Sequence, residues 1–169
     1  MELDQLFRRP SELLPYTVDL GRRLSAYGVD AVCGPLVGGA FLAAMIATSL
    51  DCEFAFADRR VSNRPGLYPV DYQIAPAMRD GLQGKRVALV DDAISAGSAL
   101  GATLIDLERC AALPVVLGAL IVIGGQAQEL AKSKSIPLLS LVQLENPIWA
   151  PDRCPLCNAG EPLIDPLAR

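Results

Sequence analysis

Two neighbouring carboxylates, Asp91 and Asp92, stand between an apolar run and a turn of small residues. The run from Val87 to Val90 is typical of a buried strand, and the residues from Ser98 onward are typical of a helix. In open parallel sheets, ligands bind at the carboxyl ends of the strands, which is where this acidic pair would emerge. Backbone amides, hydroxyls and a helix start in the turn could hold a phosphate. The turn consists of Ser95, Ala96, Gly97, Ser98 and Ala99.

The acidic pair would repel a phosphate unless it served another part of the same ligand. Carboxylates accept hydrogen bonds from vicinal hydroxyls and can approach a cation that a ligand carries. A ligand with a phosphate at one end and a diol on the same sugar is a ribose 5-phosphate. The structural alternative is an acidic pair that merely caps the next helix. The sequence contains neither a Walker loop nor a Gly-x-Gly-x-x-Gly motif.

Two other segments could lie near the same ligand. A glycine-rich loop separates an expected strand from an expected helix, and glycine permits a close approach of the backbone to a ligand. This loop contains Leu36, Val37, Gly38 and Gly39. Arg59 and Arg60 follow the second expected strand, where a solvated charge cluster is the alternative to a binding role.

The elements that must position these residues alternate between strand and helix. Strands are expected over residues 31–33, 52–57, 86–90, 115–123 and 137–144, and helices over 11–27, 41–50, 98–110 and 126–134. This order predicts an α/β fold with a doubly wound, mainly parallel, five-stranded sheet. The polar stretch from about 58 to 84 is rich in Pro and Gly and is predicted to be a functional loop, with a weak hairpin arm at 68–74. Residues 1–145 would form one domain and residues 146–169 an irregular tail.

Composition narrows the class of protein. The 169 residues suffice for one domain, and 51% apolar with only 5% aromatic residues predicts an aliphatic core that suits a covered parallel sheet. The net charge of −4 argues against a nucleic-acid partner. The absence of histidine excludes His-based triads and His-ligated zinc enzymes.

The uncharged run from Ala31 to Leu50 is the only stretch that suggests a membrane span. Its internal Pro35 and paired glycines favour a buried strand, a turn and a buried helix instead, so no membrane partner is expected. The chain opens without a signal peptide, and a cytoplasmic location is expected.

The segment from Val87 to Leu100 resembles the phosphoribosyl-pyrophosphate (PRPP) signature of type I phosphoribosyltransferases. That signature has four apolar residues, two acids, two apolar residues and a small Ser/Thr-Gly loop. The resemblance implies an enzyme that joins PRPP and a base, giving a nucleoside 5′-monophosphate and pyrophosphate, with Mg²⁺ carried on PRPP. It implies that Asp91 and Asp92 hold the ribose hydroxyls and that the loop from Ser95 to Ala99 holds the 5-phosphate.

The same resemblance assigns the remaining segments. The loop from Leu36 to Gly39, with Arg59 and Arg60, would receive pyrophosphate. Residues 58–84 would correspond to the mobile catalytic loop, which in this family often closes onto the neighbouring subunit. A homodimer is therefore expected.

Ser95 indicates the orotate enzymes within the family. The 6-oxopurine enzymes typically carry Asp at this position, whereas Asp-Asp-x-Ile-Ser-Ala-Gly-Ser-Ala resembles the Thr-Ala-Gly-Thr-Ala loop of the orotate enzymes. The resemblance covers residues 29–144. The chain departs from it by having no histidine, no lysine before Lys85 and a reduced N-terminal hood, of which only Met1–Asp4 is matched. A non-catalytic PRPP-binding regulator and a purine salvage phosphoribosyltransferase therefore stay as alternatives.

Cys154 and Cys157 form a second motif, Cys-Pro-Leu-Cys with a trailing Gly160. The spacing suits a zinc knuckle, but a structural zinc ion needs four ligands, and a second copy across a twofold axis would supply the other two. A reduced thiol pair and a redox or disulfide pair are the alternatives. Buried structural thiols are expected at Cys33, Cys52 and Cys110.

Overall fold

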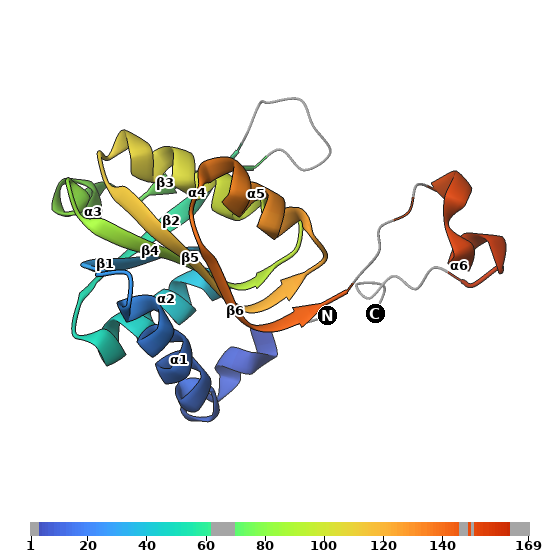
Figure 1. The fold of residues 1–169 in the computed structure, drawn as a ribbon, viewed down its shortest axis with the longest axis horizontal. Coiled ribbons are helices and arrows are strands. Elements are labelled where there is room, and N and C mark those ends of the chain that lie inside the picture. Colours follow the sequence, from blue (N-terminus) through green and yellow to red (C-terminus); the bar gives the residue numbers. More distant parts are fainter. Residues whose placement is uncertain (1–3, 62–69, 146–148, 150, 163–169) are drawn as a thin grey trace.

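A six-stranded sheet in the order β3-β2-β1-β4-β5-β6 forms the centre of the protein (Figure 1). The computed structural model describes residues 4–61, 70–145, 149 and 151–162. The strands are β1 (Ala31–Pro35), β2 (Glu53–Val61), β3 (Val70–Ile74), β4 (Arg86–Ile94), β5 (Leu113–Ile123) and β6 (Leu138–Leu144). All neighbouring strands pair in parallel except β2 and β3, which are antiparallel. The predicted α/β class and mainly parallel sheet are confirmed.

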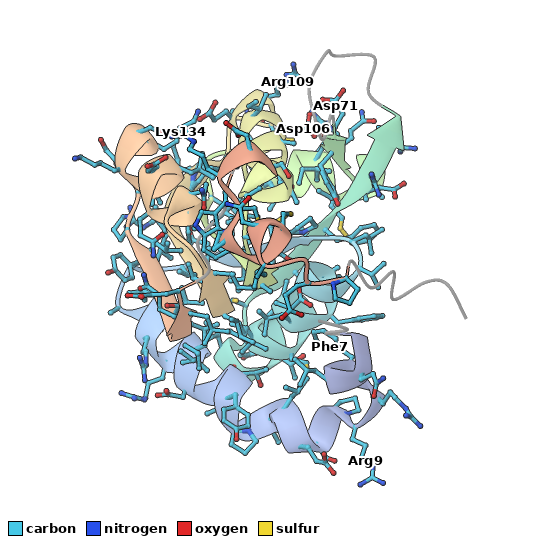
Figure 2. The ribbon with its side chains drawn as sticks, turned by 90° about the vertical axis from the view of Figure 1, so that its right-hand side faces the viewer. Phe7, Arg9, Asp71, Asp106, Arg109 and Lys134 are labelled. Atoms are coloured by element: carbon cyan, nitrogen blue, oxygen red, sulfur yellow. The ribbon has the colours of Figure 1, made fainter. Side chains whose placement is uncertain are left out.

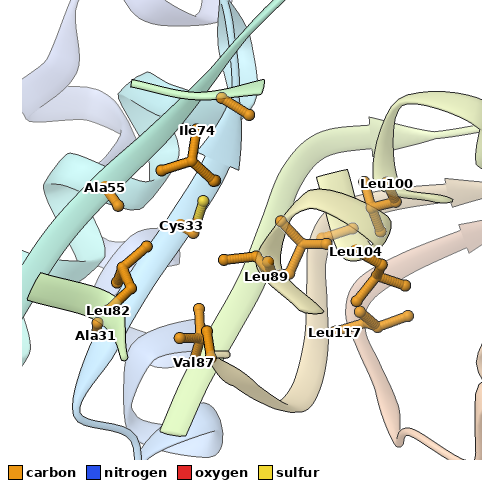
Figure 3. Close-up of a cluster of buried hydrophobic side chains, with 14 of the residues drawn as sticks. Ala31, Cys33, Ala55, Ile74, Leu82, Val87, Leu89, Leu100, Leu104 and Leu117 are labelled. Carbon is orange, nitrogen blue, oxygen red and sulfur yellow. The ribbon is translucent and has the colours of Figure 1, made fainter. Parts of the chain in front are cut away.

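Helices cover both faces of the sheet, as a doubly wound fold requires (Figure 1). One face carries η1 (Asp4–Arg8), α1 (Pro10–Ser25) and α2 (Gly38–Leu50); the other carries α3 (Pro76–Arg79), η2 (Asp80–Leu82), α4 (Ser98–Arg109) and α5 (Gln126–Lys134). Each face has its own apolar cluster. Part of the cluster under α4 is shown in Figure 3, where Cys33 and Leu89 of the sheet lie with Leu100 and Leu104 of the helix.

The opposite cluster holds α1 and α2 against the sheet. One face of α1 is buried, with Leu13, Thr17, Leu20 and Leu24 all inaccessible to solvent or nearly so. The uncharged run from Ala31 to Leu50 forms β1 and α2, as predicted, although α2 begins at Gly38 rather than at residue 41. Over the described ranges, no helix combines the length and the apolar character that crossing a membrane requires.

The prediction of five strands is wrong by one, and the loop predicted over 58–84 is too broad. β2 runs on to Val61 and pairs with β3, from Ala57 with Ile74 to Val61 with Val70. The helical turns α3 and η2 then lead back to the sheet and bury Leu82. The hairpin arm expected at 68–74 corresponds to β3. The turns α3 and η2 were not predicted, because an isolated buried residue such as Leu82 makes no periodic pattern. The narrower loop 62–69, where a mobile segment is still expected, lies outside the described residues.

At the N-terminal end, Asp4–Arg8 form the 3-10 helix η1, and most of the expected hood segment, residues 1–3, lies outside the described residues. The C-terminal end differs from expectation. The tail is not wholly irregular, because it contains η3 (Pro151–Arg153) and α6 (Pro155–Asn158). Figure 1 shows α6 beyond the end of β6, away from the sheet.

Candidate active site

Two glycines of the loop after β1 lie directly against the two carboxylates of β4. A Cβ atom on Gly38 would stand 2.5 Å from the carboxyl group of Asp92, and one on Gly39 would stand 2.6 Å from Asp91 Oδ1. The parallel pairing of β1 with β4 brings the ends of these strands to the same edge of the sheet. The structure therefore brings the glycine loop and the acidic pair together, and only glycine fits between them.

The glycine loop is held by the β2–β3 hairpin. The Leu36 N–H donates to the Ala57 carbonyl at 2.9 Å, and the Tyr72 hydroxyl donates to the Leu36 carbonyl at 3.4 Å. The peptide bond between Leu36 and Val37 is cis. The hairpin thus links the loop after β1 to the neighbouring hollow.

A hollow of about 500 Å³ joins most of the predicted site residues. Asp91 lines it together with Arg59 from β2 and Tyr72 from β3. The rest of its wall comes from Ala93, Ile94, Ser95, Ala96, Gly97, Ser98, Ala99 and Leu100. The acidic residue, one arginine and the whole predicted phosphate loop therefore share a single space that is large enough for a sugar phosphate.

Arg60 does not line this hollow. Alternate side chains of a strand point to opposite faces, so Arg59 and Arg60 cannot face the same space. Arg60 lines a separate hollow of about 460 Å³ with Asp106 and Arg109, and it lies 3.5 Å from Asp58. Of the predicted basic pair, the structure brings only Arg59 into the hollow with Asp91, and Asp92 and the loop from Leu36 to Gly39 are not among the residues that line it.

The turn from Ser95 to Ala99 leads into α4. Gly97 adopts a left-handed conformation with φ +71°, and its carbonyl accepts a hydrogen bond from Gly101 N–H at 2.8 Å as α4 begins. The first amides of an α-helix lack acceptors within the helix, and the positive end of the helix dipole lies there. Because Ser95 and Ser98 are also exposed, the turn offers backbone and hydroxyl donors to an anion.

Burial and a neighbouring carboxylate both disfavour the charged form of Asp91. Burial raises the pKa of Asp91 well above its usual value, and the neighbouring charge of Asp92 raises it further. The Asp92 N–H donates to Asp91 Oδ1 at 3.1 Å, and the Ala93 N–H donates to Asp92 Oδ1 at 2.9 Å. Hydroxyl donors or a cation carried by a ligand would relieve this repulsion, which suits a site for a sugar diol.

Two residues near the site were missed in the sequence. Tyr72 lines the hollow, and burial raises its pKa, with the charge of Asp91 adding to this effect; only the weak alternation over 68–74 pointed to it. Asp106 is buried in α4, where it accepts hydrogen bonds from Ile74 N–H at 2.8 Å and from Arg79. Figure 2 shows Asp106 in the same region as Asp71 and Arg109. In the sequence, the only indication of Asp106 was an acidic residue next to the apolar residues of α4.

With this fold and this site, the chain belongs to the phosphoribosyl transferase domain family, which residues 21–154 match. The predicted resemblance to type I phosphoribosyltransferases is confirmed. The chain is 29% identical to the orotate phosphoribosyltransferase of Thermotoga maritima over 89% of this chain and 74% of that protein. It is 25% identical to that of Caldanaerobacter subterraneus over 100% of this chain and 82% of that protein.

Solved structures agree on the fold. The orotate phosphoribosyltransferase of Aeropyrum pernix superposes with a TM-score of 0.66 at 22% identity, covering 85% of this chain and 78% of that one. The adenine phosphoribosyltransferase of Leishmania donovani superposes with a TM-score of 0.68 at 18% identity, covering 96% and 82%. Enzymes for different bases thus share this architecture, so the fold does not distinguish between bases.

Proposed function

We propose that this chain transfers the phosphoribosyl group of PRPP to orotate, giving a nucleoside 5′-monophosphate and pyrophosphate. The observation that carries the proposal is the meeting of three features at one sheet edge. These are the acidic pair of β4, the glycine loop after β1 and the turn from Ser95 to Ala99. The names of the relatives at 25–29% identity support orotate as the base.

Each part of the site has a separate task in this proposal. The turn from Ser95 to Ala99 binds the 5-phosphate through its backbone amides and hydroxyls. Asp91 and Asp92 accept hydrogen bonds from the ribose hydroxyls and stabilise positive charge as it grows on the sugar in the transition state. The loop from Leu36 to Gly39 and the guanidinium of Arg59 bind the departing pyrophosphate, whose charge a cation stabilises.

The residues present suit a magnesium ion that PRPP itself carries. Carboxylate oxygens are ligands that Mg²⁺ prefers. Among the described residues, no group of three or more His, Cys, Asp or Glu side chains gathers to hold a metal. The acidic pair would therefore add to ligands that the diphosphate and the ribose hydroxyls supply. When bound, Mg²⁺ neutralises charge on the leaving group.

A PRPP-binding regulator is the second candidate function. It is favoured by one observation: the chain has no histidine and no lysine before Lys85, although orotate enzymes usually carry both in the mobile loop. The homodimer and the cytoplasmic location expected from the sequence stay predictions.

The test is a PRPP-dependent assay with Mg²⁺ that follows the loss of orotate absorbance, run beside uracil, adenine, guanine and xanthine. Turnover of orotate in the parent, with a loss of about 100-fold or more in Asp91→Asn, is the expected result. Turnover of a purine alone would contradict the orotate assignment. Calorimetric binding of PRPP without turnover of any base would instead support the regulator.

A further inference from the structure

Cys154 and Cys157 form a pair of thiols that the candidate active site does not use. Cys154 caps the start of α6 and Cys157 lies within it. The N-cap residue and the third residue of a helix stand at the same end of it, so the two thiols lie close together. Cys157 is exposed, Cys154 is partly exposed, and neither belongs to an apolar core cluster. Packing therefore does not account for the pair, and both thiols can be reached by a ligand.

The backbone closes tightly around this pair. The Asn158 N–H donates to the Cys154 carbonyl at 3.0 Å, and the Gly160 N–H donates to the Cys157 carbonyl at 3.1 Å. Gly160 has φ +70°, a conformation that other residues adopt only with strain, and it turns the chain back after the second thiol. The two cysteines occupy the N-cap and third positions of α6, so both belong to its first turn. The turn thus presents the two sulfur atoms together, as a bidentate metal ligand must.

The spacing and the ligand type favour zinc. Thiolate ligands at Cys-x₂-Cys spacing are typical of structural zinc sites, which hold the ion with four ligands in a tetrahedron. The pair supplies two of these four. Zinc sites of this kind are closed by further Cys or His side chains, so the source of the other two ligands decides what the site is.

No second pair exists on the same chain in the part that the structure describes. The chain has no histidine, and its other cysteines number three. Cys33 and Cys110 are buried in the core cluster under α4, as expected. Cys52, expected to be buried, is only half-buried and packs against the cluster under α1 and α2. No group of three or more His, Cys, Asp or Glu side chains is found among the described residues. A second copy of the chain would supply two further thiolates of the same kind.

We propose that Cys154 and Cys157 bind one Zn²⁺ ion together with the same two residues of a second copy of this chain. A twofold axis through the metal converts two identical thiol pairs into a tetrahedral set of four, which is the self-complementary arrangement of a symmetric dimer. On binding, each of the four thiols releases its proton and its sulfur donates an electron pair to Zn²⁺. No oxidation is involved. The site is separate from the acidic pair, so this proposal stands or falls independently of the proposed function.

The test uses the full-length chain, reduced and freed of metal, with Co²⁺ as a spectroscopic substitute for Zn²⁺. Titration is expected to give the thiolate-to-metal charge-transfer band and the d–d bands of a tetrahedral tetrathiolate site. Their intensity should saturate at about one Co²⁺ per two chains, and one Zn²⁺ per two chains should abolish them. Cys154→Ser and Cys157→Ser should each lose the bands, whereas Cys52→Ser, a control outside the motif, should retain them.

Three outcomes would overturn the proposal. No bands at any Co²⁺ concentration would show that the pair does not bind such a metal. Saturation at one ion per chain would show that the site is completed without a second copy. Unchanged bands in both motif variants would place the metal elsewhere. Far-ultraviolet circular dichroism of each variant distinguishes loss of the site from loss of the fold.

Discussion

Gly39 lies so close to Asp91 that a single added carbon would stand 2.6 Å from the carboxylate oxygen Oδ1. The same hypothetical carbon would stand 2.7 Å from Cδ of Pro35 and 3.0 Å from the carbonyl oxygen of Val90. Those neighbours are a proline ring and a strand backbone, neither of which can move aside easily. The glycine loop and the acidic pair are therefore one structural unit, and a side chain in the loop must displace the carboxylate.

Gly39→Ala is accordingly expected to lower kcat/KM for PRPP by at least about tenfold and to destabilise the fold by roughly 1–3 kcal/mol through overpacking. Gly125→Ala is the matched control, since Gly125 has φ −108° and nothing within 4 Å of its hypothetical Cβ. Steady-state kinetics and urea unfolding of both variants make the comparison. If Gly39→Ala retained the parental kcat/KM, the loop would not set the position of Asp91.

The Asp91→Asn variant is expected to be more stable than the parent, by an amount that grows as the pH rises. The raised pKa of Asp91 means that the folded state keeps this proton longer than the unfolded chain, whose group ionises near the ordinary value of 3.8. Parental stability is therefore highest below that pH and falls until the pH exceeds the raised pKa of the folded state. Asparagine does not ionise, and the difference should grow by about 1.4 kcal/mol for each unit of the shift.

Urea unfolding of the parent and of Asp91→Asn between pH 4 and pH 8 measures this difference. Asp152→Asn, at an exposed tail residue, serves as the control and should show no comparable trend. A difference that stays constant over this range would mean that the folded state does not hold the Asp91 proton. If Asp91→Asn is more stable but less active than the parent, the Asp91 carboxylate contributes to ligand binding and lowers the stability of the fold.

Much of this site could be predicted because it depends on local patterns and on the geometry of parallel sheets. The apolar run before Asp91 predicted a strand, and the small residues after it predicted a turn. Parallel strands with their carboxyl ends at one edge then placed the glycine loop beside the acidic pair. The helix expected over 11–27 likewise corresponds to α1 (Pro10–Ser25).

The features that the sequence predicts weakly or not at all depend on contacts between distant residues. β3 is an edge strand whose partner is the extension of β2 to Val61, and neither half shows a strong pattern alone. Asp106 bonds to Ile74 and Arg79, which are 32 and 27 residues away along the chain. β2 continues through Arg59 and Arg60 as a strand, which places their side chains on opposite faces of the sheet. The sequence analysis placed both residues in a loop, where no such difference is expected.

Asp106→Ala is expected to lower the free energy of unfolding by about 3 kcal/mol. The substitution leaves the Ile74 N–H and the Arg79 guanidinium without the buried carboxylate that accepts their hydrogen bonds. Glu108→Gln is a control on the same helix, since its ion pair with Lys134 is largely exposed and contributes at most about 1 kcal/mol. Equal losses in urea unfolding for the two variants would show that Asp106 does not hold the hairpin to α4.

Arg59→Gln and Arg60→Gln, at neighbouring residues of β2, test which arginine serves the site. Arg59 lines the hollow with Asp91 and the turn after β4, whereas Arg60 lines the separate hollow beside Asp106. A hydrogen bond to a charged partner contributes about 1.5–3 kcal/mol, so Arg59→Gln is expected to lower kcat/KM for PRPP by roughly 10- to 150-fold. Arg60→Gln is expected to change it by less than about threefold, because its exposed partner Asp58 lies 3.5 Å away and such pairs contribute little.

Both variants remove one positive charge from the same strand, so a general effect of net charge would lower kcat/KM equally in the two. Equal losses, or a larger loss in Arg60→Gln, would therefore contradict the assignment of Arg59 to the pyrophosphate.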